Sequence, residues 1–126
     1  MNRAFGITAA ALGAAAVMLG AFGAHALRGN LDAASLQVWH TAVEYQFWHV
    51  LALLAVAVSA PARDRNWWRA AGIACTGGGM AFSGSLYALA LGAPSWVGAI
   101  TPLGGLALIG GWILLAVAFG RQSHTT

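Results

Sequence analysis

The 126-residue chain has very few charged side chains. Only 7% of its residues are charged, lysine is absent, and the three acidic residues are Asp32, Glu44 and Asp64. A soluble domain carries about 25% charged residues. Because 60% of the chain is hydrophobic as well, this shortage excludes an ordinary soluble domain and favours an integral membrane protein.

Cysteine and catalytic motifs are also scarce. The single cysteine, Cys75, excludes an intramolecular disulfide and a cysteine-rich zinc site, and we expect it to be a small buried residue. The sequence has no GxSxG, no HExxH and no phosphate-binding loop, and it has no water-facing pair of carboxylates. We therefore predict a protein that is not an enzyme, and we predict no cofactor or metal.

Four long apolar segments are present. They lie at about residues 4–26, 36–60, 69–91 and 96–119, and a helix needs about 20 residues to cross a bilayer. The segments are continuously apolar instead of alternating, which favours helices over a barrel. Short connections make neighbouring helices antiparallel. The predicted fold is all-α: one domain, residues 1–126, forming an up-down-up-down four-helix bundle in the membrane.

The arginines predict the orientation. With a cytoplasmic N-terminus, one arginine lies outside (Arg28) and five lie inside: Arg3, Arg63, Arg65, Arg69 and Arg121. This bias predicts both termini in the cytoplasm and a multi-pass protein of the bacterial inner membrane. The arginines occur in short segments beside the spans instead of in one patch, so nucleic acid is not an expected partner. Residues 1–26 also resemble a signal peptide, but the apolar run is long, so we expect a retained span.

The second span carries an unusual number of polar residues. We expect its helix to begin at an N-cap, Asp32 or Ser35, and to end before Pro61. At 100° per residue, one stripe contains His40 and Glu44 together with Gln37, Thr41 and Trp48. Tyr45 and His49 form a second stripe, about 120° around the helix. His49 lies about 13 Å deeper than His40.

Glu44 has two interpretations. A charged acid inside the bilayer costs about 3 kcal/mol, so Glu44 should face the bundle, pair with His40 or Arg28, or be protonated, and then it is a candidate functional group. Alternatively, Glu44 reaches the interface and merely fixes the position of the helix.

His49, with Tyr45 and Gln46, has two interpretations as well. It could hydrogen-bond to Ser83, Ser85 or Tyr87 on another helix, or it could belong to a ligand, quinone or proton site. His25 and His40 are expected at similar depths on neighbouring helices, so a haem held by two histidines is an alternative. His124 lies in a polar tail and is expected to be solvated.

Glycine, proline and tryptophan predict local features. Gly77-Gly78-Gly79 could mark a thin or unwound place beside a cavity, or close packing in the bundle or in a homo-oligomer. Thr101-Pro102 predicts a kink in which Thr101 satisfies the carbonyl freed near residue 98. The tryptophans are expected to form interfacial belts, outer for Trp39 and Trp96 and inner for Trp67 and Trp68.

Several motifs in order resemble one family. They are GAFGAHAL at 20–27, TAV at 41–43 with Tyr45, Gln46 and His49, FSGSLY at 82–87, TPLGG at 101–105, and Gly111 with Trp112. This pattern is similar to the YgdD/YwdK-like family of small bacterial inner-membrane proteins, which has eukaryotic transmembrane relatives. The resemblance implies a four-helix membrane protein of unknown activity. His40 and Glu44 do not belong to the pattern.

Together these features suggest a small binding or accessory component of the membrane, acting as a homo-oligomer or within a larger complex. Its predicted polar cluster has His49 as the proton acceptor or ligand contact, with hydroxyl groups orienting it; the members are His25, Tyr45, Gln46, His49, Ser83, Ser85 and Tyr87. The alternatives are an oligomeric transporter or channel for a small solute or protons, and a haem- or quinone-binding redox subunit.

Overall fold

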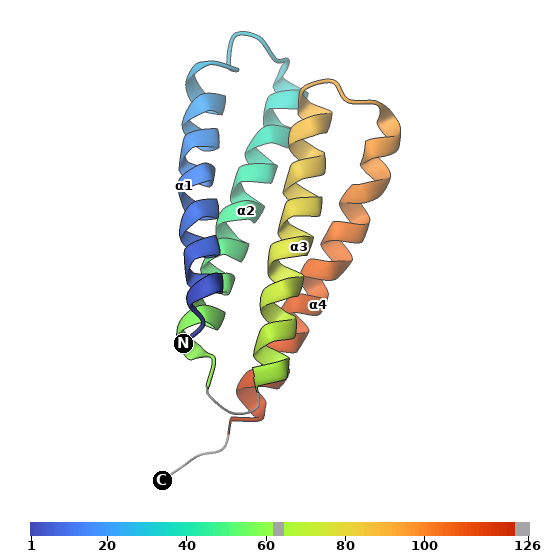
Figure 1. Ribbon diagram of the computed structural model, residues 1–126. Coiled ribbons are helices and arrows are strands. Elements are labelled where there is room, and N and C mark those ends of the chain that lie inside the picture. The colour runs from blue at the N-terminus through green and yellow to red at the C-terminus, as the bar shows by residue number, and fades with distance from the viewer. Residues whose placement is uncertain (62–64, 123–126) are drawn as a thin grey trace.

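The structure, a computed structural model, describes residues 1–61 and 65–122. Four long helices lie side by side, each antiparallel to the next (Figure 1): α1 (Arg3–His25), α2 (Ala33–Ser59), α3 (Arg65–Ala90) and α4 (Ile100–Gly120). A short 3₁₀ helix, η1 (Ser95–Ala99), precedes α4. No strand occurs in the described ranges. The predicted all-α four-helix bundle is therefore confirmed, with the start of α1 and the end of α4 at the same end of the molecule.

The helix ends follow local sequence signals. The Asp32 side chain caps α2 by accepting from the Ser35 N–H at 2.7 Å, and this hydrogen bond lowers the pKa of the Asp32 carboxyl. The helix ends at Ser59, two residues before Pro61. At the start of α1, Asn2 Oδ1 accepts from the Phe5 N–H at 3.0 Å. Arg63, Asp64 and His124, which entered the sequence argument, lie outside the described residues.

Three helical segments are long and apolar enough to cross a membrane: α1, α2, and η1 with α4. α3 has 26 residues against 27 in α2, and it is less apolar because it carries two arginines, Arg65 and Arg69, and five glycines. It lies between α2 and α4, and it packs against both (Figure 1). A helix covered by neighbours presents less of its surface to lipid, which explains how the least apolar of the four helices fits in the bundle.

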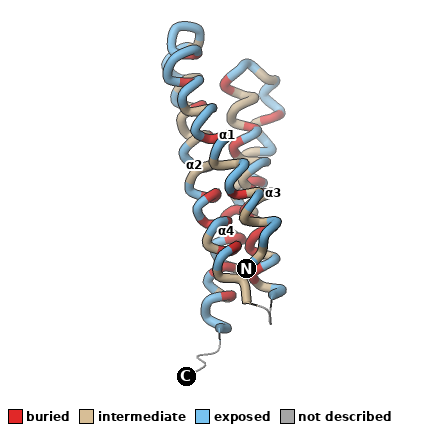
Figure 2. The backbone as a smooth tube through the Cα atoms, turned by 60° about the vertical axis from the view of Figure 1, so that its left-hand side comes forward, coloured by how far each residue is buried: buried red, intermediate tan, exposed pale blue. Residues whose placement is uncertain are grey.

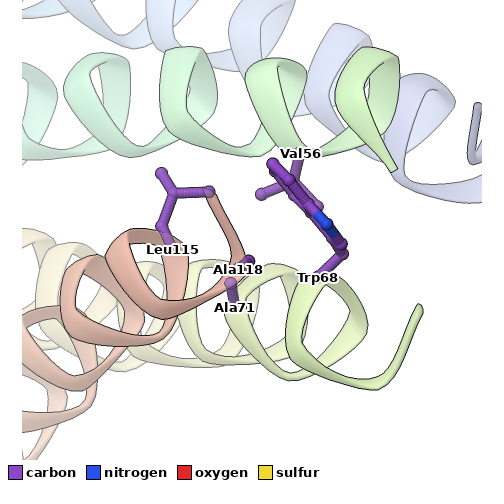
Figure 3. Packing of buried hydrophobic residues seen from close by; sticks show 5 residues of the cluster. All are labelled: Val56, Trp68, Ala71, Leu115 and Ala118. Atoms are coloured by element: carbon purple, nitrogen blue, oxygen red, sulfur yellow. The ribbon is translucent and has the colours of Figure 1, made fainter. Parts of the chain in front are cut away.

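The core lies along the inner faces of the helices, while exposed positions run along their outer faces (Figure 2). One cluster at the end that holds the start of α1 joins α2, α3 and α4 (Figure 3); its members are Val56, Trp68, Ala71, Leu115 and Ala118. At the other end, Trp39 packs with Leu27 and Ala90. Trp39 and Trp68 are thus core residues, 3% and 2% exposed. The prediction that they face the membrane interfaces is wrong, whereas Trp96 is 68% exposed.

Glycine allows α3 and α4 to approach very closely. A Cβ atom on Gly104 would lie 2.5 Å from the Phe82 backbone nitrogen, and one on Gly78 would lie 3.0 Å from the Leu108 backbone nitrogen. α3 runs without interruption through Gly77, Gly78 and Gly79. The glycine run is therefore not unwound, and Gly78 serves close packing instead.

Pro102 does not kink the middle of a helix. Because η1 ends at Ala99 and α4 begins at Ile100, Pro102 lies in the first turn of α4, where the missing N–H is not needed. Thr101 was expected to satisfy a freed carbonyl near residue 98. Its hydroxyl instead lies 2.6 Å from Ser85 Oγ on α3.

The glycine contact between α3 and α4 gives a first prediction. Gly104→Ala places a methyl group against the Phe82 backbone, which cannot rotate away, so we expect a loss of about 1–3 kcal/mol in stability. Gly110→Ala is the matched control, since a Cβ there meets nothing within 4 Å. Thermal unfolding in detergent measures both. Equal melting temperatures for the two variants would contradict this contact.

Candidate functional site

His49 lies at the middle of α2, 6% exposed, with both ring nitrogens hydrogen-bonded. Trp112 Nε1 on α4 lies 3.0 Å from His49 Nε2, and His49 Nδ1 lies 2.7 Å from the Tyr45 carbonyl oxygen. An indole N–H can only donate, so His49 Nε2 accepts the hydrogen bond from Trp112. His49 Nδ1 therefore carries the proton and donates a hydrogen bond to the Tyr45 carbonyl. The contacts therefore select the neutral Nδ1–H tautomer of His49.

Two expectations about His49 are corrected by these contacts. Its partner on another helix is Trp112, not Ser83, Ser85 or Tyr87, and it is oriented by an indole and a carbonyl instead of by hydroxyl groups. The Tyr45 ring stacks on the imidazole with ring centres 6.2 Å apart. Trp112 was not in the predicted cluster. Its position far from both ends of α4 was the available signal, because a tryptophan away from the interface needs a partner for its N–H.

Gln46 connects three helices. Its Nε2 donates to the Leu12 carbonyl of α1 at 2.8 Å, and its Oε1 accepts from the Tyr87 hydroxyl of α3 at 2.7 Å. Nearby, Ser83 Oγ donates to the Ala42 carbonyl of α2 at 2.8 Å. Ser85 bonds to Thr101. The predicted polar residues on α2 and α3 therefore do face inward, but they form separate hydrogen-bonded sets instead of one cluster.

His25 is not part of these sets. It is exposed at the last position of α1. Gly23, two residues earlier, packs against the Trp39 ring of α2, and His25 is rotated about 200° from that face. His25 therefore points away from α2, the helix that carries His40.

Glu44 is exposed on the outer face of α2. Within the described ranges, no cation lies within ion-pair distance of it, so the predicted pairing with Arg28 or His40 is absent there. Thr41, one turn away, donates its hydroxyl to the Gln37 carbonyl at 3.1 Å. Glu44 is thus directed away from the interior whereas His49 is buried, so the two lie on different faces of α2 as expected. Which of these faces meets the bundle was left open by the sequence.

A groove of about 260 Å³ lies between α1 and α3, with α2 as its floor. Its walls are mainly apolar, and Gln46, His49, Ser83 and Tyr87 contribute polar atoms. The remaining lining residues are Leu12, Ala15, Leu19, Val50, Leu53, Cys75, Thr76, Gly79, Met80 and Gly84. Gly79 borders this groove, whereas its neighbour Gly78 packs against α4. In the described part of the chain, no three His, Cys, Asp or Glu side chains are grouped to hold a metal ion.

Known proteins resemble this chain along most of its length. The model of a family described as "Protein of unknown function (DUF423)" matches residues 19–105. The UPF0382 membrane protein YwdK of Bacillus subtilis is 46% identical over 110 residues, which are 82% of this chain and 85% of the relative. The chain belongs to this family. The resemblance inferred from its motifs is thereby confirmed.

Other members of the DUF423 family are similarly close. The UPF0382 inner membrane protein YgdD of Escherichia coli is 40% identical over 111 residues, covering 88% of this chain and 85% of its own length. A UPF0382 membrane protein of Haemophilus influenzae is 47% identical over 100 residues, which are 79% of this chain and 80% of the relative. No solved structure matches the chain. The protein is thus a small membrane protein, and the predicted inner-membrane location agrees with that of the E. coli relative.

The contact between His49 and Trp112 gives a second prediction. Hydrogen bonds between helices in membranes contribute about 0.6 kcal/mol, and up to about 2 kcal/mol. We expect His49→Leu and Trp112→Phe each to lower stability without preventing membrane insertion, and the double variant to lose less than the sum. Reversible unfolding in mixed micelles measures this coupling. Strict additivity of the two substitutions would contradict the hydrogen bond.

Proposed function

We propose that the protein is a non-enzymatic binding component of the inner membrane, and that the groove between α1 and α3 takes one apolar chain of a lipid-like molecule. The observation that carries the proposal is the groove itself, an apolar hollow with a polar strip on its floor. Its volume of about 260 Å³ is near the lower end of the roughly 300–1,000 Å³ of small-molecule sites. That size suits a single chain or ring better than a whole lipid.

Gln46 and Tyr87, two of the polar residues that line the groove, would set the orientation of a bound ligand. Gln46 uses one N–H on the Leu12 carbonyl, which leaves its second amide proton for a ligand. The Tyr87 hydroxyl donates to Gln46 Oε1, and the lone pairs of its oxygen remain able to accept a hydrogen bond from a ligand. A ligand with a carbonyl or hydroxyl group at one end would place that group beside Gln46 and Tyr87, and its apolar part along Leu12, Val50 and Leu53. This chemistry includes a quinone ring as well as an acyl chain.

The geometry favours binding over proton transport. A proton relay requires a side chain with a free lone pair or a transferable proton, yet His49 uses Nε2 on Trp112 and Nδ1 on the Tyr45 carbonyl. Glu44, the one acidic residue within the spans, faces outward. His49 therefore serves as a support for the groove floor in this proposal.

Filling the groove tests this function. Gly84 lines the groove, and a Cβ added there meets nothing within 4 Å, so Gly84→Leu should fill the groove without disturbing the helices. Gly110→Leu is the matched control on α4, because its Cβ is equally unobstructed. Membranes labelled with a diazirine-bearing fatty acid are irradiated, and the modified residues are mapped by mass spectrometry.

We expect labelling of groove residues such as Leu12 and Met80 in the parent and in Gly110→Leu, and its loss in Gly84→Leu. The same labelling in all three proteins would contradict groove binding, and so would label spread evenly over the lipid-facing residues of α4.

We also propose that two copies associate through the outer face of α2. The exposed or half-exposed residues of this face recur at alternating spacings of four and three, as in helices that pack along a seam; they are Gln37, Thr41, Glu44, Trp48, Leu51, Ala55 and Val58. Lipid offers no partner to the amide of Gln37 or the carboxyl of Glu44. A second copy in the same orientation brings identical residues together at equal depth, so these groups can bond to each other.

Cysteine cross-linking tests this association. In a Cys75→Ala background, Leu51→Cys should form a covalent dimer when membranes are oxidised. Leu106→Cys on α4 is the control, since Leu51 and Leu106 are 60% and 66% exposed. Adding Glu44→Leu should reduce the yield at residue 51. Cross-linking that is equal at residues 51 and 106 would rule out a specific α2 interface.

A further inference from the structure

α1 begins, α2 ends and α3 begins at one end of the bundle (Figure 1). A second hollow, of about 580 Å³, is lined by residues from this end. It is separate from the groove between α1 and α3, with which it shares no lining residue. One side is formed by residues 1–5, another by Ala60 and Pro61, and a third by the first turns of α3.

Three arginines line this hollow. Arg3 comes from the first turn of α1, and Arg65 and Arg69 come from successive turns of α3. All three are exposed, and none is within ion-pair distance of a carboxylate among the described residues. Among residues 1–61 and 65–122, no acidic residue lines the hollow. The sequence suggested that the arginines are dispersed in separate short segments, but the fold brings half of the six together.

The backbone around the arginines is fixed by contacts that do not use them. The Asn2 N–H donates to the Ala57 carbonyl at 2.8 Å, which holds the start of α1 against the end of α2. Trp68, between Arg65 and Arg69 in sequence, is buried in the core cluster (Figure 3). Burial of that indole fixes the rotation of α3, and the i,i+4 spacing then places Arg65 and Arg69 on one face.

The presence of three arginines around one hollow suits an anion. The planar, always-charged guanidinium matches the oxygens of phosphate with paired hydrogen bonds, and positive charge gathered in a hollow concentrates anions. The asparagine side chains of Asn2 and Asn66 also line the hollow. Its chemistry therefore fits a phosphate group better than a lone carboxylate, which has fewer oxygens to share among three arginines.

Apolar side chains line the hollow beside the arginines, and Ile73 follows Arg69 by one turn on the same face of α3. Phe5, Trp68 and Ile73 line the same hollow, and Ile73 is 58% exposed on the outer surface of α3, which faces lipid. An amphiphile would place its phosphate among the arginines and its chains along Ile73. We propose that this hollow binds the phosphate of an anionic phospholipid in the leaflet at the arginine-rich end of the protein. Free phosphate shares the charged chemistry but makes no use of these apolar side chains.

Arg69→Gln and Arg28→Gln form a matched pair for the test. Each removes one positive charge, but Arg28 lies in the connection between α1 and α2, at the opposite end of the bundle. The purified proteins are titrated with phosphatidylglycerol or phosphatidylcholine in detergent, and bound lipid is counted by native mass spectrometry. Arg69→Lys, which keeps the charge, and the melting temperature of each variant show whether the fold is intact.

The parent and Arg28→Gln should bind phosphatidylglycerol more tightly than phosphatidylcholine. Arg69→Gln should bind phosphatidylglycerol about tenfold more weakly, which is the effect of losing one hydrogen bond between charged groups, and Arg69→Lys should recover part of the affinity. Excess inorganic phosphate should not displace the lipid. Displacement by phosphate would overturn the lipid assignment in favour of a soluble anion. Equal binding by Arg69→Gln and Arg28→Gln, or equal binding of the two lipids, would overturn the site itself.

Discussion

The arrangement of the bundle depends on hydrogen bonds in which polar side chains donate to backbone carbonyls of neighbouring helices. Lipid provides no hydrogen-bond partner, so a polar group inside the membrane must find one in the protein. Gln46 bonds to the Leu12 carbonyl, Trp39 to the Leu19 carbonyl and Ser83 to the Ala42 carbonyl. In the described residues, no buried side-chain nitrogen or oxygen lacks a partner.

Small residues make these carbonyls reachable. The Trp39 ring fits over Gly23, where a Cβ would lie 2.5 Å from the indole, and its N–H then meets the Leu19 carbonyl one turn earlier. Of the glycine positions that face the backbone of another helix, the closest is Gly104 of α4 against α3. Between α1 and α3 the packing is more open along the middle of the bundle, and the groove occupies that space. In lipid, helices are not drawn together by the hydrophobic effect, so packing and hydrogen bonding determine where they meet. This explains both the tight contact between α3 and α4 and the open groove between α1 and α3.

The sequence predicted the elements of the fold better than the partners of its side chains. Hydropathy identified the four helices, and the N-cap candidates Asp32 and Ser35 and the stop at Pro61 identified the ends of α2, because each of these signals lies within the segment itself. Helical periodicity correctly separated Glu44 from His49. It could not identify Trp112 as the partner of His49, since residues 63 positions apart are brought together only by the packing of α2 against α4. For the same reason Trp39 was expected at the interface: its sequence position suggests a membrane boundary, but Gly23 on another helix provides the space that buries it.

The hydrogen bonds also imply an order of assembly. Those of Gln46, Ser83 and Ser85 join helices that follow one another in the chain, so each can form as soon as the next helix has entered the membrane. The His49–Trp112 bond joins α2 to α4, which are not consecutive. During synthesis, His49 Nε2 has no hydrogen bond from Trp112 until α4 has entered the membrane. Insertion of α4 therefore supplies the final polar partner of α2, and a chain truncated before α4 would leave the His49 imidazole without this hydrogen bond in the membrane.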